Sequence, residues 1–197
     1  MTQRLDDSEL AQNRHYKSRE RVREQGEVFT QKREVDAMLD LMPDAFKSLD
    51  TSFLEPAAGN GNFLVEIFRR KLDLISEAEF GGTQRWFEFA VLVGLSSIYG
   101  IDIDPENVDE ARWRLLNEIK LRTEDVDCLR AAEVIVETNI VVGDTLESPE
   151  SIRLVKYQPM QGERFRRTIE FLRQPEVDLF YEPPEDLPEV HFSELKK

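Results

Sequence analysis

Three short apolar segments, each with an acid at its carboxyl end, constrain the fold of this chain more than any other feature. They are SFLEP at 52–56, SSIYGIDI at 96–103 and NIVVGD at 139–144. Their length and their apolar and β-branched residues are typical of short buried strands, and longer helical patterns separate them. Strands that alternate with helices indicate a parallel sheet with crossover helices, so we predict an α/β domain.

The segments between these strands have the patterns of helices. Residues 61–75 and 104–122 place apolar side chains on one face, and residues 81–95 begin with a turn and continue as a very apolar helix. Asp104 suits the N-cap of its helix, and Pro105 suits the first helical position. The order of elements predicts a doubly wound, mostly parallel sheet.

The N-terminal region predicts helices outside this sheet. Residues 5–25 are highly charged and look helical, and Val35, Met38, Leu39 and Met42 recur with the spacing of one helix face. We therefore divide the chain into a helical N-terminal extension over 1–43, an α/β domain over 44–150, and an acidic, proline-rich C-terminal extension over 151–197. We expect this last segment to be an extended or irregular arm.

The acidity of the chain limits its partners. The 197 residues carry a formal net charge of −14 at pH 7, so the chain alone should bind nucleic acid weakly. A single cysteine excludes an internal disulfide, and two histidines far apart in sequence make a metal centre unexpected. No segment has the pattern of a signal peptide or a membrane span, so we expect a cytoplasmic protein without a membrane partner.

Acidic residues at the ends of the predicted strands indicate a ligand site. Glu55, Asp102 and Asp144 occupy these places, and Gly59 and Gly61 follow the first strand. Ligands of open parallel sheets bind at the carboxyl ends of the strands. Glycines let the backbone approach a ligand, and the next helix N-terminus favours an anion. Carboxylates can accept hydrogen bonds from ribose hydroxyls or an adenine amine. The pattern therefore predicts a site for a nucleoside that bears a carboxylate.

A dinucleotide site fits this pattern less well. The fingerprint G-x-G-x-x-G needs a small residue at position 64, which is Leu64. Its ribose-binding acid should lie about 20 residues beyond the glycines, whereas Asp102 lies 41 residues beyond Gly61 (102 − 61).

Four elements occur in a recognisable order: GEVFT at 26–30, FLEPAAGNGNFLVEI at 53–67, IYGIDIDPENVDEAR at 98–112 and NIVVGDTL at 139–146. In this order they resemble the cofactor-binding half of S-adenosylmethionine-dependent DNA adenine-N6 methyltransferases of restriction–modification systems. The resemblance covers about residues 14–147. It implies a Rossmann-like class I methyltransferase fold with S-adenosylmethionine as the cofactor.

The resemblance also implies roles by position. In the family, the glycine loop wraps the methionine end of the cofactor and the upstream element closes over it. The acid after the second strand binds the ribose, its apolar neighbour packs on the adenine, and the acid after the third strand accepts from the adenine amine. The matching positions are Phe29 and Thr30 upstream, Glu55, Pro56, Ala57, Gly59 and Gly61 around the loop, Asp102 with Ile103, and Asp144.

Simpler structural roles stay open for several of these residues. Glu55 also fits a surface acid, and Asp102 fits an ordinary cap at a strand end. Asp144 fits a turn acid after a glycine, and Phe29 fits a core position. Cys128 is expected to be an inert buried thiol, because no cationic group or histidine adjoins it.

The residues that would bind a target base are missing from the expected place. Adenine-N6 methyltransferases carry N/D/S-P-P-Y/F/W, which holds the target amine and stacks on the flipped base. The nearest string is YEPPE at 181–185, where Glu185 replaces the aromatic residue and cannot stack. An acidic tail is the simpler interpretation, so we assign no catalytic residue. The roughly fifty residues after 147 are also too few for a target-recognition domain.

Three functions stay open. The first is the cofactor-binding subunit of a DNA methyltransferase, which meets DNA through a partner that supplies the tetrad and the target-recognition domain. The second is a non-catalytic, methyltransferase-like interaction subunit or truncated remnant. The third is a methyltransferase for a small molecule or a protein, with a site that the sequence does not reveal.

Overall fold

The structure is a computed structural model that describes residues 30–77, 83–172 and 184–196. The chain divides into two compact units, 1–30 and 31–197, and Thr30 is the described residue of the first. The charged helix expected over 5–25 and the candidate residue Phe29 lie outside the described residues.

A three-stranded parallel sheet forms from the three predicted strands. Its strands are β1 (Phe53–Glu55), β2 (Ile98–Asp102) and β3 (Ile140–Val142). They lie side by side in the order β1-β2-β3, and both neighbouring pairs are parallel. The predicted α/β class with a parallel sheet is confirmed. All three carboxyl ends therefore lie at one edge of the sheet.

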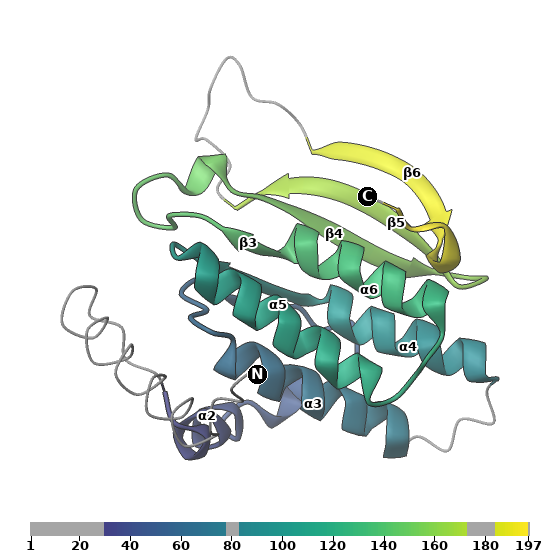
Figure 1. Cartoon of the computed structure of the whole chain (residues 1–197), viewed down its shortest axis with the longest axis horizontal. Helices are drawn as coiled ribbons and strands as arrows, with labels where there is room; N and C mark the ends of the chain where they lie inside the picture. The colour runs from purple at the N-terminus through teal and green to yellow at the C-terminus, as the bar shows by residue number, and fades with distance from the viewer. Residues whose placement is uncertain (1–29, 78–82, 173–183, 197) are drawn as a thin grey trace, which may run out of the picture. The chain divides into compact units, whose positions relative to one another are not determined.

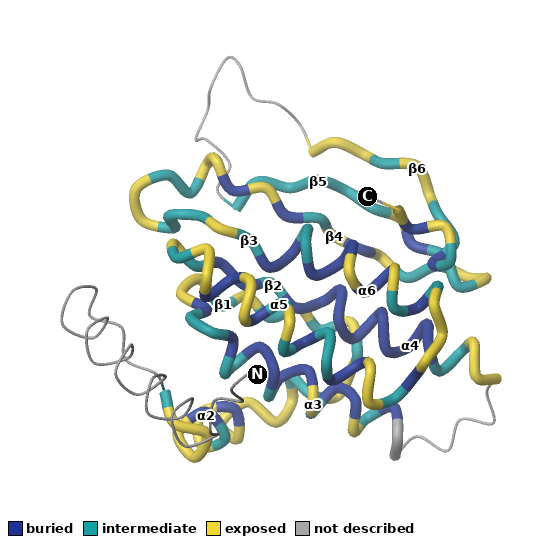
Figure 2. The backbone as a smooth tube through the Cα atoms, viewed as in Figure 1, coloured by how far each residue is buried: buried dark blue, intermediate teal, exposed yellow. Residues whose placement is uncertain are grey.

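Four helices pack against the middle strand of this sheet and against one another, and Figure 1 labels all four. They are α3 (Asn62–Glu77), α4 (Gln84–Ser96), α5 (Pro105–Lys120) and α6 (Val126–Asn139). The predicted start of α5 is confirmed, because the Asp104 side chain accepts a hydrogen bond from the Glu106 amide and Pro105 is the first helical residue. The apolar stripes of these helices form the main core, seen as the dark blue segments in Figure 2. None of the helices in the described ranges is long and apolar enough to cross a membrane.

Close packing between α3 and the sheet depends on a glycine in the middle strand. A Cβ atom at Gly100 would lie 2.6 Å from Leu64 Cδ1 and 3.3 Å from Ala58 Cβ. Leu64 is fully buried, so its side chain has little room to move away. This contact fixes how α3 leaves the loop that follows β1.

A second, antiparallel sheet occupies much of the C-terminal segment, which we expected to be extended or irregular. Strands β4 (Arg153–Met160), β5 (Arg164–Phe171) and β6 (Glu185–His191) lie in the order β4-β5-β6. The buried side chains Tyr157 and Phe165 pack into the main core. The alternation of apolar and polar residues at 155–158, and over much of 164–171, therefore favours strands despite the acidic composition downstream.

Proline-rich composition does not prevent the last strand from forming. β6 contains Pro188 and pairs only with β5 among the described strands. A proline is tolerated on an edge strand, where its missing N–H faces away from the ladder. Of the YEPPE string, residues 181–183 lie outside the described residues, and Glu185 begins β6.

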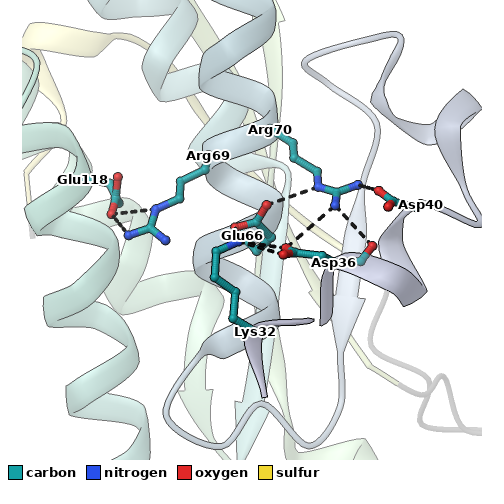
Figure 3. Close-up of polar contacts among 7 residues, drawn as sticks. All are labelled: Lys32, Asp36, Asp40, Glu66, Arg69, Arg70 and Glu118. Carbon is teal, nitrogen blue, oxygen red and sulfur yellow. Dashed lines mark hydrogen bonds and ion pairs between the residues drawn. The ribbon is translucent and has the colours of Figure 1, made fainter. Parts of the chain in front are cut away.

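Ion pairs hold the helix α2 (Lys32–Leu39) on α3 (Figure 3). Arg70 of α3 forms an ion pair with Asp40 at 2.8 Å and with Glu66 at 3.3 Å, and it donates to the Asp36 carbonyl at 3.2 Å. Lys32 bridges Asp36 and Glu66 at 2.9 and 3.2 Å. The short helix η1 (Pro43–Phe46) follows, and Arg70 also lies over the Phe46 ring.

Arg70→Met is therefore expected to lower the free energy of unfolding by about 1 kcal/mol, because it removes a partly exposed network and one backbone hydrogen bond. The matched control is Arg33→Met on the exposed side of α2, which should change stability by less than about 0.5 kcal/mol. Urea denaturation measures both. Equal stability of the two variants would show that the network does not hold α2.

Candidate cofactor site

The loop after β1 is attached to the end of β2 by two hydrogen bonds. We call residues 56–61 the glycine loop. The Ala58 amide donates to the Ile101 carbonyl at 2.8 Å, and the Gly59 amide donates to Asp102 Oδ2 at 2.7 Å. Two of the predicted site residues, Gly59 and Asp102, are thus in direct contact although 43 positions separate them in the sequence.

The loop after β3 joins the same place. The Gly143 amide donates to the Asp102 carbonyl at 3.0 Å, and the Thr145 hydroxyl donates to the Pro56 carbonyl at 3.3 Å. The ends of all three parallel strands are therefore connected to one another. We call this cluster of three loops the strand-end site.

Asp102 lies at the centre of the strand-end site. In addition to the bond from Gly59, its Oδ1 accepts from the Asp104 amide at 2.9 Å and from Asn107 Nδ2 at 3.2 Å. A carboxylate offers about four acceptor positions, so three internal donors leave room for one from a ligand. The capping role left open for Asp102 is present, and the carboxylate retains acceptor capacity beyond it.

The two glycines of the loop have different surroundings. Both adopt a positive φ, 52° at Gly59 and 85° at Gly61. A Cβ at Gly61 would lie 2.8 Å from Ala111 Cβ of α5, whereas a Cβ at Gly59 would have no atom within 4 Å. Gly61 thus allows the loop to pack against α5, and Gly59 faces open space that a ligand can approach.

Glu55 lies at the end of β1 and turns back on the loop. Its side chain accepts from the Ala57 amide at 3.2 Å. Partial burial raises the pKa of Glu55, and the Ala57 amide opposes this shift. Pro56 and Ala57 are exposed beside it. Glu55 is therefore a half-buried acid within the strand-end site.

Asp144 organises the turn after β3. Its Oδ1 accepts from the Leu146 and Glu147 amides, both at 2.9 Å. The role of a turn acid, which the sequence left open, is therefore present in the structure. Among the described residues no donor is placed on Asp144 Oδ2, so this oxygen can accept from a ligand amine.

Large apolar side chains are unusually exposed around the strand-end site. Ile103, directly after Asp102, is 68% exposed, and Val142 and Leu146 are 52% and 88% exposed. Exposed apolar side chains at the rim of a polar site are typical of a surface that binds a ligand or a partner.

The structure does not place the upstream candidates relative to this site, and Phe29 lies outside the described residues. Thr30 is half-buried and directly precedes Gln31, the N-cap of α2. It belongs to the unit 1–30, which has no defined position relative to 31–197. Closure of Phe29 and Thr30 over the cofactor therefore stays a prediction.

Two polar residues of α5 belong to the site, and neither was predicted from the sequence. Asn107 is buried and donates to Asp102, while Arg114 donates to the Asn60 carbonyl at 2.7 Å and to Asn62 Oδ1 at 2.8 Å. Asn107 and Arg114 lie seven positions apart, on the same helix face as Ala111. In the sequence, polar side chains spaced along the same helix face as apolar core residues were the signal that could have predicted these contacts.

The described residues contain no group of three or more His, Cys, Asp and Glu side chains that could hold a metal ion. Cys128 is fully buried, and burial raises the pKa of its thiol to about 12. The strand-end site therefore offers backbone amides, carboxylates and apolar surface for binding.

No protein-family model, curated protein or solved structure matches this chain.

Proposed function

We propose that the chain binds S-adenosylmethionine at the strand-end site and is the cofactor-binding part of a DNA adenine-N6 methyltransferase. The observation that carries this proposal is the convergence of three strand-end loops on Asp102. The sheet order β1-β2-β3 is also the order of one half of a doubly wound sheet. A class I methyltransferase fold is part of the proposal.

The residues at the site fit this cofactor by their chemistry. Asp102 can accept from one ribose hydroxyl, and Asp144 Oδ2 can accept from the adenine amine. The exposed Ile103 can pack on the adenine ring. The glycine loop leads into the N-terminus of α3, and a helix N-terminus favours an anion such as the carboxylate of the methionine end.

S-adenosylmethionine supplies an activated methyl group, and the residues of this chain bind it and set its orientation. Their contribution to transfer is proximity, because a held methyl donor makes the reaction effectively unimolecular. Binding the target base and polarising its amine belong to the partner subunit in this proposal. We therefore assign no catalytic residue to this chain.

The sheet itself supports the need for a partner. β1 has only β2 as a neighbour among the described strands, and Leu54 on β1 is 49% exposed. Parallel sheets are normally covered on both faces. A partner that adds a strand beside β1 would pair its free edge, and further elements of that partner would cover the face that exposes Leu54. With a net charge of −14, this chain would meet DNA through that partner.

Isothermal titration calorimetry with S-adenosylmethionine tests the proposal. We expect saturable one-site binding to the unaltered chain. Asp102→Asn should weaken it about thirtyfold, because a charged hydrogen-bond acceptor contributes about 2 kcal/mol. The asparagine keeps the shape of the side chain and one acceptor oxygen, but its NH2 group replaces an oxygen that accepts from Gly59 or from Asp104 and Asn107. Urea denaturation of the variant therefore accompanies the titration and shows that it is folded.

The matched control is Asp125→Ala. Asp125 caps α6, where it accepts from the Cys128 amide at 2.7 Å, and it takes no part in the strand-end site. Its loss should cost about 1 kcal/mol of stability and leave the affinity within twofold. A folded chain that shows no heat with millimolar S-adenosylmethionine would overturn the proposal. Such a result would favour a non-catalytic interaction subunit.

A further inference from the structure

One arginine of α5 holds the glycine loop at both sides of Gly61. Arg114 Nη1 donates to the Asn60 carbonyl at 2.7 Å and to Asn62 Oδ1 at 2.8 Å. Asn60 in turn donates from Nδ2 to Glu110, also on α5, at 3.4 Å. The loop is thus held from the α5 side as well as by β2.

The surroundings of Arg114 indicate that these contacts are its main polar interactions. The guanidinium is half-buried, and this burial lowers its pKa, with Arg69 acting in the same direction and Glu110 and Glu118 opposing it. A partly buried guanidinium that donates to a carbonyl forms a strong, charge-assisted hydrogen bond. Losing it would leave the Asn60 carbonyl and the Asn62 side chain to find other partners.

We infer that Arg114 is a positioning residue that fixes the glycine loop for the methionine end of the cofactor, an inference that rests on the proposed function. Arg114 acts through Asn60 and Asn62, which lie on either side of Gly61 and next to the first turn of α3. The ribose and adenine contacts involve other groups, the carboxylates of Asp102 and Asp144.

Another arginine on the same helix provides a matched control. Arg112 donates to the Ile140 carbonyl at 2.8 Å and to the Glu137 carbonyl at 3.3 Å. It is half-buried like Arg114, and these two contacts lie at the end of α6 and the start of β3, away from the strand ends. It also pairs with the exposed Asp109 at 3.5 Å. Arg112→Met therefore removes two comparable guanidinium bonds without touching the glycine loop.

Amide hydrogen exchange of the cofactor-free chain tests the effect on the loop. In Arg114→Met we expect the amides of Gly59 and Gly61 to exchange about tenfold faster, because the charge-assisted bonds to Asn60 and Asn62 are lost. In Arg112→Met these amides should change by less than twofold. Unchanged exchange in Arg114→Met would overturn the inference whether or not the chain binds a cofactor.

Calorimetry with two ligands tests the link to the methionine end. Arg114→Met should weaken S-adenosylmethionine about tenfold and leave adenosine within twofold, because adenosine lacks the methionine portion. Arg114→Lys, which can still donate to both acceptors, should recover the affinity for S-adenosylmethionine to within threefold. Arg112→Met should change neither affinity by more than twofold.

The outcomes separate this inference from the proposed function. If the unaltered chain binds neither ligand, the proposed function fails and the affinity role of Arg114 fails with it, and exchange still decides its role in the loop. If the unaltered chain binds and Arg114→Met binds both ligands equally well, only the inference fails. An equal loss for both ligands would assign Arg114 a general structural role and would also overturn it.

Discussion

Gly61→Ala is expected to lower the free energy of unfolding by about 3 kcal/mol. The residue has φ 85°, a conformation that costs an L-residue about 1–2 kcal/mol. The new Cβ would also lie 2.8 Å from Ala111 Cβ and 3.1 Å from Ala111 Cα. Because Ala111 Cα belongs to the helix backbone, α5 or the loop must shift. Such overpacking costs a further amount of about 1–3 kcal/mol.

Gly59→Ala is the control that separates strain from contact. Gly59 also has a positive φ, 52°, but a Cβ there would meet nothing within 4 Å. We expect a loss of about 1 kcal/mol, from strain alone. Urea denaturation of both variants, with the m-value checked for a two-state transition, measures the difference.

A second substitution identifies the contact itself. Ala111→Gly removes the methyl group that the new Cβ would strike, at a cost of about 1 kcal/mol in helix propensity. In the double variant Gly61→Ala/Ala111→Gly, the loss of stability should be smaller than the sum of the two single-variant losses. We expect a difference of about 1 kcal/mol or more, which is the usual coupling between residues in contact. Strict additivity, or equal losses in Gly59→Ala and Gly61→Ala, would contradict the packing of the loop on α5.

The parallel sheet and its helices were predictable because their signals are local. The strand at 98–102 is recognisable from its own β-branched residues, and the start of α5 from Asp104 and Pro105. Parallel pairing then brings Glu55, Asp102 and Asp144 to one edge, as predicted, because all parallel strands end on the same side.

The internal contacts of the site could not be predicted in this way. The bond between Gly59 and Asp102 joins residues 43 positions apart, and no local pattern specifies it. In the sequence, Arg114 has the pattern of an ordinary solvent-exposed cation on a helix. Only the packing of α3 against α5 places it beside Asn60 and Asn62. Whether a polar side chain faces solvent or a neighbouring loop depends on tertiary packing, which spacing alone does not determine.

Two further differences have local physical causes. Val35 and Leu39 are buried as predicted, but Met38 and Met42 are 53% and 45% exposed. α2 ends at Leu39, so Met42 lies beyond the helix that would have placed it on the same face. Over 153–171 the strand alternation was present, but the acidic, proline-rich composition further along dominated the interpretation of the whole segment.

The second large effect concerns Lys71, whose side chain is fully buried in α3. Its Nζ donates to the Leu49 carbonyl at 2.7 Å and to the Thr51 carbonyl at 2.8 Å, and it lies 5.1 Å from the centre of the Phe53 ring. These contacts fix the chain just before β1. Burial lowers the pKa of Lys71 from 10.5 to about 8, and Asp50 opposes this shift.

The lowered pKa predicts how stability depends on pH. Below pH 8 both the folded and the unfolded chain carry the charge, and the folded state bears the cost of burying it. Between pH 8 and 10.5 the folded lysine loses its proton first, so the unfolded state binds more protons and stability rises with pH. A shift of this size corresponds to about 3 kcal/mol over that interval.

Lys71→Met removes this pH-dependent contribution. The unfolding free energy of the unaltered chain should therefore rise relative to that of the variant by about 3 kcal/mol from pH 7.5 to 10.5. The comparison is made as a difference because Cys128 and Tyr99 also titrate. Burial raises the pKa of each to about 12, and this lowers the stability of both chains equally at high pH.

Lys32→Met is the control of opposite sign. The hydrogen bond from Lys32 to Asp36, followed by that to Glu66, raises the pKa of this exposed lysine. Its contribution to stability is therefore lost as the pH rises through the folded pKa, so the unaltered chain should lose stability relative to Lys32→Met near the top of the pH range. Parallel curves for the unaltered chain and Lys71→Met would contradict the buried position of the ammonium group. They would require a solvated lysine, and the carbonyls of Leu49 and Thr51 would then need other donors.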